Sequence, residues 1–333
     1  MCGGFHRGGD YLDTIRKMQG AVFAREGAGS RLLVGRYQLL ERIGEGGMGV
    51  VWRAFDLDLE EPVAIKFLRD EFAADDTLRG WFRREVKLAR RVTHRNVARV
   101  FEFGRDGDAY FLTMEYVPGE SLLARLERAP SLASAEVWHL AFGLCQGLAA
   151  AHAAGVIHGD IKPANILLAP GRGAVLTDFG VARVLSEANI SPEANLGGTP
   201  LYMAPEQFVD ARVTLRGDIY ALGVVLCEAL TGVFPWPVDS LSLLLDAKCC
   251  GADPDFQALL PALAPEWRDL IRTCLRSDPH QRPADAGELL GHLVQVASAI
   301  AELDGPQLAA KLHPTLHPGL AAGLHPRRGE LQS

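Results

Sequence analysis

The chain has 333 residues, 48% of them hydrophobic, and a formal net charge of −7 at pH 7. This length and apolar content allow one large domain, or two lobes, with a substantial core. The negative charge argues against a chain that coats nucleic acid or an anionic membrane, because neither surface would attract it over long range. We therefore expect no nucleic-acid partner.

The six cysteines are dispersed and include no CxxC pair, so the sequence predicts neither a zinc site nor a disulfide framework. With no secretory leader in view, we expect a cytoplasmic protein. The most apolar long window, residues 137–157, contains His139, Gln146 and His152. These polar residues indicate a core helix, and we expect no membrane span.

Residues 1–36 are rich in glycine and arginine without a clear core pattern, and we expect a flexible arm there. From Tyr37 the pattern changes to short alternating apolar runs, which are typical of strands. Such runs occupy residues 37–43, 50–56, 62–67, 98–103 and 110–116. Together they predict an antiparallel sheet.

Residues 78–92 carry apolar side chains at helical spacing among arginines and predict an amphipathic helix. After the Pro118-Gly119 break the pattern is mainly helical. Helices are expected at 121–128, 133–153, 216–230, 241–248, 265–275 and 284–300. The sequence thus predicts an α+β fold with a strand-rich lobe (37–117) and a larger helical lobe (118–297), and ligands commonly bind where two such lobes meet.

Three Leu-His-Pro triplets follow the last expected helix. Repeated prolines prevent a helix there. We expect residues 298–333 to be a low-complexity flexible tail, with weak metal capture by its histidines as the lesser alternative.

A glycine-rich loop with the spacing G-x-G-x-x-G-x-V joins the first two expected strands. It contains Gly44, Glu45, Gly46, Gly47, Met48, Gly49, Val50 and Val51. Glycines allow a tight turn and let backbone N–H groups approach phosphate oxygens. The dinucleotide-binding fingerprint has the same spacing but opens a helix, whereas this loop leads into a strand.

Lys66 ends the apolar run Val63-Ala64-Ile65, and strand alternation directs it opposite to Ile65. A solvated surface lysine is the simpler interpretation. The sequence holds only six lysines, however, and Glu85 on the following helix offers a carboxylate partner. A Lys66–Glu85 ion pair would hold the ammonium towards the α- and β-phosphates of a nucleotide.

Two carboxylates, an amide and an amine lie on two loops joined by a hairpin. They are Asp160, Lys162, Asn165 and Asp178. One carboxylate can orient a hydroxyl, the other carboxylate and the amide can hold Mg²⁺ by oxygen, and the lysine can neutralise phosphate charge. This set suits metal-assisted phosphoryl transfer.

In this order the motifs closely resemble those of a eukaryotic-like (Hanks-type) bacterial serine/threonine protein kinase, from about Tyr37 to Val296. The resemblance implies a bilobal protein-kinase-like fold, use of ATP with Mg²⁺ or possible Mn²⁺, autophosphorylation and a role in signal transduction. It also implies protein substrates with Ser or Thr hydroxyls. The implied ATP site comprises Ile43, Gly44, Glu45, Gly46, Gly47, Met48, Gly49, Val50, Val51, Ala64, Lys66, Glu85, Met114, Glu115 and Val117.

The same resemblance assigns catalytic roles. Asp160 is similar to the aspartate that accepts the substrate hydroxyl proton, and Lys162 to the lysine that contacts the γ-phosphate. Asn165 and Asp178 resemble the two metal ligands. Thr199 resembles the substrate-loop threonine, which favours Ser and Thr over Tyr as acceptors.

Two supporting contacts are also implied by the resemblance. Glu206, in Ala204-Pro205-Glu206, is expected to pair with Arg282. Asp218 is expected to brace the catalytic loop by accepting hydrogen bonds from its backbone N–H groups.

Two alternatives stay open. His-Gly-Asp with a downstream Asn also occurs in small-molecule kinases similar to aminoglycoside phosphotransferases, although Lys162, Thr199 and Arg282 favour a protein substrate. The second alternative is a pseudokinase that binds partners without transferring phosphate. Its usual mark is loss of the residues equivalent to Lys66, Asp160 or Asp178, and all of these are present.

Gly159 departs from the pattern, because many protein kinases carry at this position an arginine that pairs with an activation-loop phosphate. We therefore predict that phosphorylation of Ser186 and Ser191 has little influence on activity. Replacing both with alanine should lower turnover less than about tenfold, or roughly 1.4 kcal/mol. Turnover of material with a verified phosphorylation state measures this, and a larger loss would contradict it.

Overall fold

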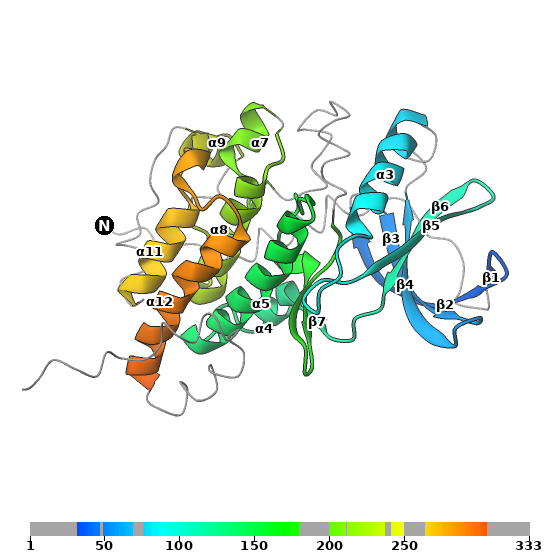
Figure 1. The fold of residues 1–333 in the computed structure, drawn as a ribbon, viewed down its shortest axis with the longest axis horizontal. Coiled ribbons are helices and arrows are strands. Elements are labelled where there is room, and N and C mark those ends of the chain that lie inside the picture. The colour runs from blue at the N-terminus through cyan, green and yellow to red at the C-terminus, as the bar shows by residue number, and fades with distance from the viewer. Residues whose placement is uncertain are drawn as a thin grey trace, which may run out of the picture.

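The computed structural model describes residues 32–46, 49–68, 76–179, 200–210, 212–236, 241–249 and 264–304. A strand-rich lobe and a mainly helical lobe lie side by side (Figure 1). The first lobe holds an antiparallel sheet with strand order β1-β2-β3-β4-β6-β5. Its strands are β1 (Leu32–Leu33), β2 (Tyr37–Gly46), β3 (Gly49–Asp56), β4 (Glu61–Leu68), β5 (Val100–Asp106) and β6 (Ala109–Glu115). The five strands expected from alternation are confirmed within a few residues.

Helix α3 (Asp76–Ala89) packs on one face of this sheet. Its Phe82 and Val86 join Ala64, Leu112 and Met114 in one buried apolar cluster. The amphipathic pattern correctly predicted the helix and its buried face.

The helical lobe is built around two helices that are buried along most of their length. Its helices are α4 (Leu122–Arg128), α5 (Ser134–Ala153), α7 (Pro205–Val209), α8 (Leu215–Thr231), α9 (Leu241–Cys249), α11 (Pro265–Cys274) and α12 (Ala286–Asp304). Helices α5 and α8 each contribute more buried residues than any other described helix of the lobe. Trp138 on α5 donates from Nε1 to Leu293 O on α12 at 3.0 Å, which ties the outer helix to the core.

The candidate catalytic residues lie on loops next to a small second sheet. It contains β7 (Glu120–Ser121), β8 (Ile166–Ala169) and β9 (Gly173–Leu176), and the short 3-10 helix Pro163–Asn165 leads into β8. The β8–β9 hairpin therefore joins the two polar loops, as the sequence predicts.

Two predicted boundaries are wrong. The expected flexible arm of residues 1–36 wrongly includes β1, because Leu33 pairs with Tyr37 and is fully buried. A two-residue strand is too short to show a periodic pattern. At the other end α12 continues to Asp304, past the expected start of the tail at residue 298. The Leu-His-Pro triplets lie outside the described residues. Among the helices that the structure describes, none has the length and apolar character of a membrane span.

Leu33 and Leu32 test whether β1 belongs to the folded domain. Leu33 is 0% exposed and Leu32 is 48% exposed. Leu33→Ala should lower the free energy of unfolding by about 2–4 kcal/mol, because it leaves a cavity, whereas Leu32→Ala should cost less than about 0.5 kcal/mol. Urea denaturation measures both values, and equal values for the two variants would contradict the assignment.

Candidate active site

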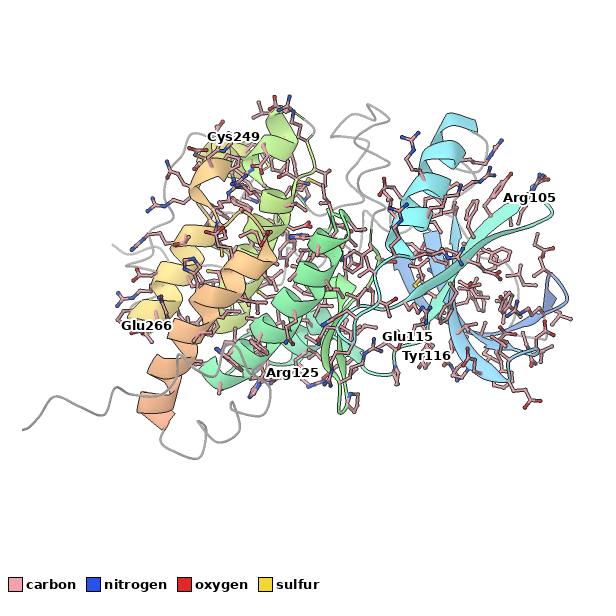
Figure 2. The ribbon with its side chains drawn as sticks, viewed as in Figure 1. Arg105, Glu115, Tyr116, Arg125, Cys249 and Glu266 are labelled. Carbon is pink, nitrogen blue, oxygen red and sulfur yellow. The ribbon has the colours of Figure 1, made fainter. Side chains whose placement is uncertain are left out.

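The connector between the lobes is fixed by an arginine from the β8–β9 turn. Glu115 and Tyr116 lie where β6 leaves the sheet (Figure 2). The Arg172 guanidinium donates to both Glu115 carboxylate oxygens, with 3.2 Å between Nη2 and Oε2, and also to Val97 O at 3.0 Å. Arg172 therefore holds the connector against the helical lobe. The sequence does not indicate this role, since an arginine in a glycine-rich turn has the pattern of a surface loop.

Several residues of the expected ATP site meet on β3, β4 and β6 beside this connector. Met114 lies opposite Ala64 on the neighbouring strand, and Val51 lies opposite Lys66. Ala64 and Met114 are buried, with Val51 packed against the same cluster. Val117 is also buried, but in a separate cluster with Ala98, Ala169 and Val175.

The glycine-rich loop is only partly described. Ile43, Gly44, Glu45 and Gly46 end β2, and Gly49 and Val50 begin β3. Gly47 and Met48 lie outside the described residues. A Cβ at Gly49 would lie 1.8 Å from Phe67 O, whereas one at Gly44 would meet nothing closer than 3.8 Å. Gly49 is therefore required by close approach of two strands, independently of any nucleotide.

Lys66 reaches from the strand-rich lobe to the second polar loop. Its Nζ lies 2.9 Å from Asp178 Oδ1, and the lysine side chain is 7% exposed. Burial alone would raise the pKa of Asp178, but the Lys66 ammonium outweighs it and holds this pKa below its ordinary value. Glu85 is buried on α3, and its pairing with Lys66 stays a prediction.

The first polar loop forms a compact group around Asp160. Lys162 Nζ lies 2.7 Å from Asp160 Oδ2. Asn165 Nδ2 donates to the same carboxylate oxygen at 2.9 Å and to Asp160 O at 2.8 Å. Both the backbone and the side chain of Asp160 are therefore held in one orientation.

Backbone contacts join the two polar loops. Thr177 N donates to Asn165 O at 2.9 Å, and His158 Nε2 lies 2.9 Å from Thr177 O. Burial lowers the pKa of His158, which favours the neutral ring. Because Asp178 follows Thr177, the structure brings the two expected metal ligands, Asn165 and Asp178, to one place.

The donor set of Asn165 and Asp178 fits a hard cation. The Asn165 amide nitrogen is used on Asp160, which leaves the amide oxygen for a cation. Asp178 pairs with Lys66 through Oδ1, and its carboxylate offers oxygen ligands to a cation. Mg²⁺ prefers such oxygen ligands and takes few of them from protein when phosphates supply the others.

The expected brace by Asp218 is confirmed. Its carboxylate accepts hydrogen bonds from His158 N and Gly159 N, both at 2.8 Å, and lies 3.0 Å from His152 Nε2. Gly159 has φ +79°, a conformation that glycine adopts without the cost of a Cβ. His152 is a second positioning residue. The sequence does not indicate this role, because it shows His152 only as a polar residue in a core helix.

The expected Glu206–Arg282 pair is also confirmed. Two parallel hydrogen bonds of 2.8 and 3.0 Å join the groups, and the Arg282 side chain is fully buried. The segment before Glu206 lines a hollow together with the catalytic loop, through Tyr202 and Met203 on one side and Gly159 and Asp160 on the other. Thr199, Ser186 and Ser191 lie outside the described residues.

Comparisons with known proteins agree with this geometry. The protein kinase domain family matches residues 37–294. Serine/threonine-protein kinase PknL of Mycobacterium tuberculosis is 34% identical over 273 residues, which cover 82% of this chain and 68% of PknL. Probable serine/threonine-protein kinase PkwA of Thermomonospora curvata is 38% identical over 260 residues, or 78% of this chain and 34% of PkwA. This chain therefore spans about two thirds of the first relative and one third of the second.

Solved structures show the same fold. The crystal structure of the Mycobacterium tuberculosis PknI kinase domain has a TM-score of 0.65 and 26% identity, and the match covers 82% of this chain and 100% of that one. A structure of Rad53 residues 1–466 in complex with AMP-PNP has a TM-score of 0.65 at 22% identity, covering 77% of this chain and 64% of that one. At that identity the Rad53 likeness concerns the fold alone.

Proposed function

This chain belongs to the protein kinase domain family as a bacterial Hanks-type serine/threonine kinase, and from that premise we propose how its residues transfer the γ-phosphoryl group of ATP to a protein hydroxyl. The observation that carries the proposal is the convergence of Asp160, Lys162 and Asn165 from one loop with the Lys66–Asp178 pair from the other. The contacts within each set are 2.7–2.9 Å long, and the hydrogen bond from Thr177 N to Asn165 O joins the two loops at 2.9 Å.

Asp160 orients the attacking hydroxyl and accepts its proton. The hydroxyl oxygen forms a bond to the γ-phosphorus while the bond from that phosphorus to the bridging oxygen breaks, and ADP leaves. Lys162, already beside Asp160, neutralises charge on the transferred group. Lys66 holds the α- and β-phosphates, so catalysis by these residues consists mainly of positioning and electrostatic stabilisation.

Asn165 and Asp178 are the residues that would hold Mg²⁺, or Mn²⁺ in its place. When bound, the ion neutralises phosphate oxygens during transfer. With the ion on Asp178, the Lys66 ammonium 2.9 Å from that carboxylate would be free to contact phosphate oxygens. The adenine is placed against Ala64, Val51 and Met114 beside the connector.

The proposed function includes autophosphorylation and a cytoplasmic location. Autophosphorylation on Ser or Thr is expected, and mass spectrometry of protein incubated with ATP tests it. A cytoplasmic site of action suits the buried cysteines Cys145, Cys227 and Cys274, which form no disulfide. Cell fractionation tests that location, and recovery in an extracellular fraction would overturn it.

Asp160→Asn removes the proton acceptor while keeping the shape of the side chain. Transfer of label from ATP to casein should fall by about 100-fold or more, whereas the affinity for ATP should change less than about threefold. Asp108→Asn is the matched control, because that side chain is fully exposed in the β5–β6 turn. The measurement combines initial rates with mapping of phosphosites.

Three outcomes would contradict the proposal. Unchanged transfer by Asp160→Asn would remove the role given to this carboxylate. ATP binding without any transfer by the wild type would indicate a pseudokinase. Transfer only to an added amino-sugar would indicate a small-molecule kinase.

A further inference from the structure

A buried lysine outside the polar loops contacts the segment that lines the hollow beside Asp160. Lys248, near the end of α9, is 1% exposed. Its Nζ lies 3.3 Å from Pro200 O, 2.6 Å from Leu201 O and 2.8 Å from Met203 O. An ammonium group has three N–H donors and no acceptor, so these three carbonyls match the charged form.

Aromatic rings complete the surroundings of this ammonium. Nζ lies 5.1 Å from the ring centre of Trp236, 5.3 Å from that of Tyr220 and 5.9 Å from that of Phe208. Ring faces attract a cation more strongly where water is excluded. Burial lowers the pKa of Lys248 to about 7. The three carbonyls and the ring faces around Nζ are partners that suit the charged form.

The carbonyls that Lys248 holds belong to residues 200–203. Within this segment Tyr202 and Met203 line the hollow that also contains Asp160. Tyr202 Oη donates to Glu228 Oε2 on α8 at 2.7 Å, so α8 fixes the segment from a second side. Helix α9 lies beside α7 at one end of the helical lobe, where Cys249 marks the end of α9 (Figures 1 and 2).

We propose that Lys248 is a positioning residue for the protein substrate: its ammonium holds residues 200–203 in the conformation that presents an acceptor hydroxyl to Asp160. This inference rests on the proposed kinase function. Lys248 lies outside the nucleotide site, so its effect falls on the acceptor and not on ATP.

The burial of Lys248 predicts how the fold responds to its replacement. A lysine among neutral partners loses its hydration on folding, and that loss opposes folding. Replacement by methionine, which has similar length, removes this penalty but takes one hydrogen-bond donor away from each of the three carbonyls, of which Pro200 O keeps Met203 N. The fold should therefore tolerate Lys248→Met, while residues 200–203 lose their restraint.

Steady-state kinetics separate positioning from general damage. In Lys248→Met the KM for casein should rise at least about tenfold, and the KM for ATP should change less than about threefold. The slow hydrolysis of labelled ATP without acceptor should persist. Lys87→Met is the matched control, since Lys87 is exposed on α3, and it should behave as wild type. Unchanged casein KM in Lys248→Met would overturn the proposal.

Hydrogen exchange gives a readout that does not depend on activity. Met203 N donates to Pro200 O at 3.3 Å and Ala204 N to Gln207 Oε1 at 2.8 Å. In Lys248→Met these two amides should exchange about tenfold faster, with α5 and α8 unchanged. Exchange that stays as in wild type overturns the role of Lys248 even if the chain is an active kinase. If the two amides exchange faster in Lys248→Met while the wild-type protein transfers no phosphoryl group, the result supports the contact of Lys248 with residues 200–203 and rejects the kinase function.

Lys248→Gln covers the case in which the methionine variant does not fold. Glutamine keeps two N–H donors, so it should give the same changes in KM and exchange with smaller amplitude. Wild-type values for this variant at both readouts would also overturn the proposal.

Discussion

The active site depends on a carboxylate that takes no part in the chemistry. Asp218 is 2% exposed and accepts hydrogen bonds from two consecutive backbone N–H groups of the catalytic loop. A buried charge is costly unless polar donors surround it, and here the donors are the backbone of His158 and Gly159 together with the His152 ring. The requirement to satisfy this charge thus determines the path of the catalytic loop.

Asp218 connects three helices to the reacting groups. Asp218 belongs to α8 and His152 to α5, and His152 Nδ1 accepts a hydrogen bond from Ala286 N at the start of α12, at 3.3 Å. His158 in the catalytic loop contacts Thr177 O through its ring, and Thr177 directly precedes Asp178. Lys66 then joins the strand-rich lobe to this network through a single ion pair. Arg172–Glu115 is a second ion pair that joins the strand-rich lobe to the helical lobe.

Much of this arrangement could be predicted from the sequence, because its signals are local. Strand alternation and helical spacing predict most elements. Asp160, Lys162, Asn165 and Asp178 lie close together in the sequence, on the two loops that the β8–β9 hairpin joins. The Asp218 brace and the Glu206–Arg282 pair followed from a family resemblance and match the observed contacts. What the sequence did not reveal depends on distant chain segments. Arg172 and Lys248 act on backbone carbonyls, and a carbonyl has no sequence signature.

The most direct test of the account is the activity of Asp218→Asn. An amide of the same shape offers only one acceptor oxygen and presents N–H groups towards donors, so at least one backbone N–H of the catalytic loop loses its partner. We predict that transfer to protein falls by about 100-fold or more while the ATP affinity changes less than about threefold and the chain stays folded. Wild-type turnover in a folded Asp218→Asn variant would contradict the central claim that this buried carboxylate holds the catalytic loop in its working geometry.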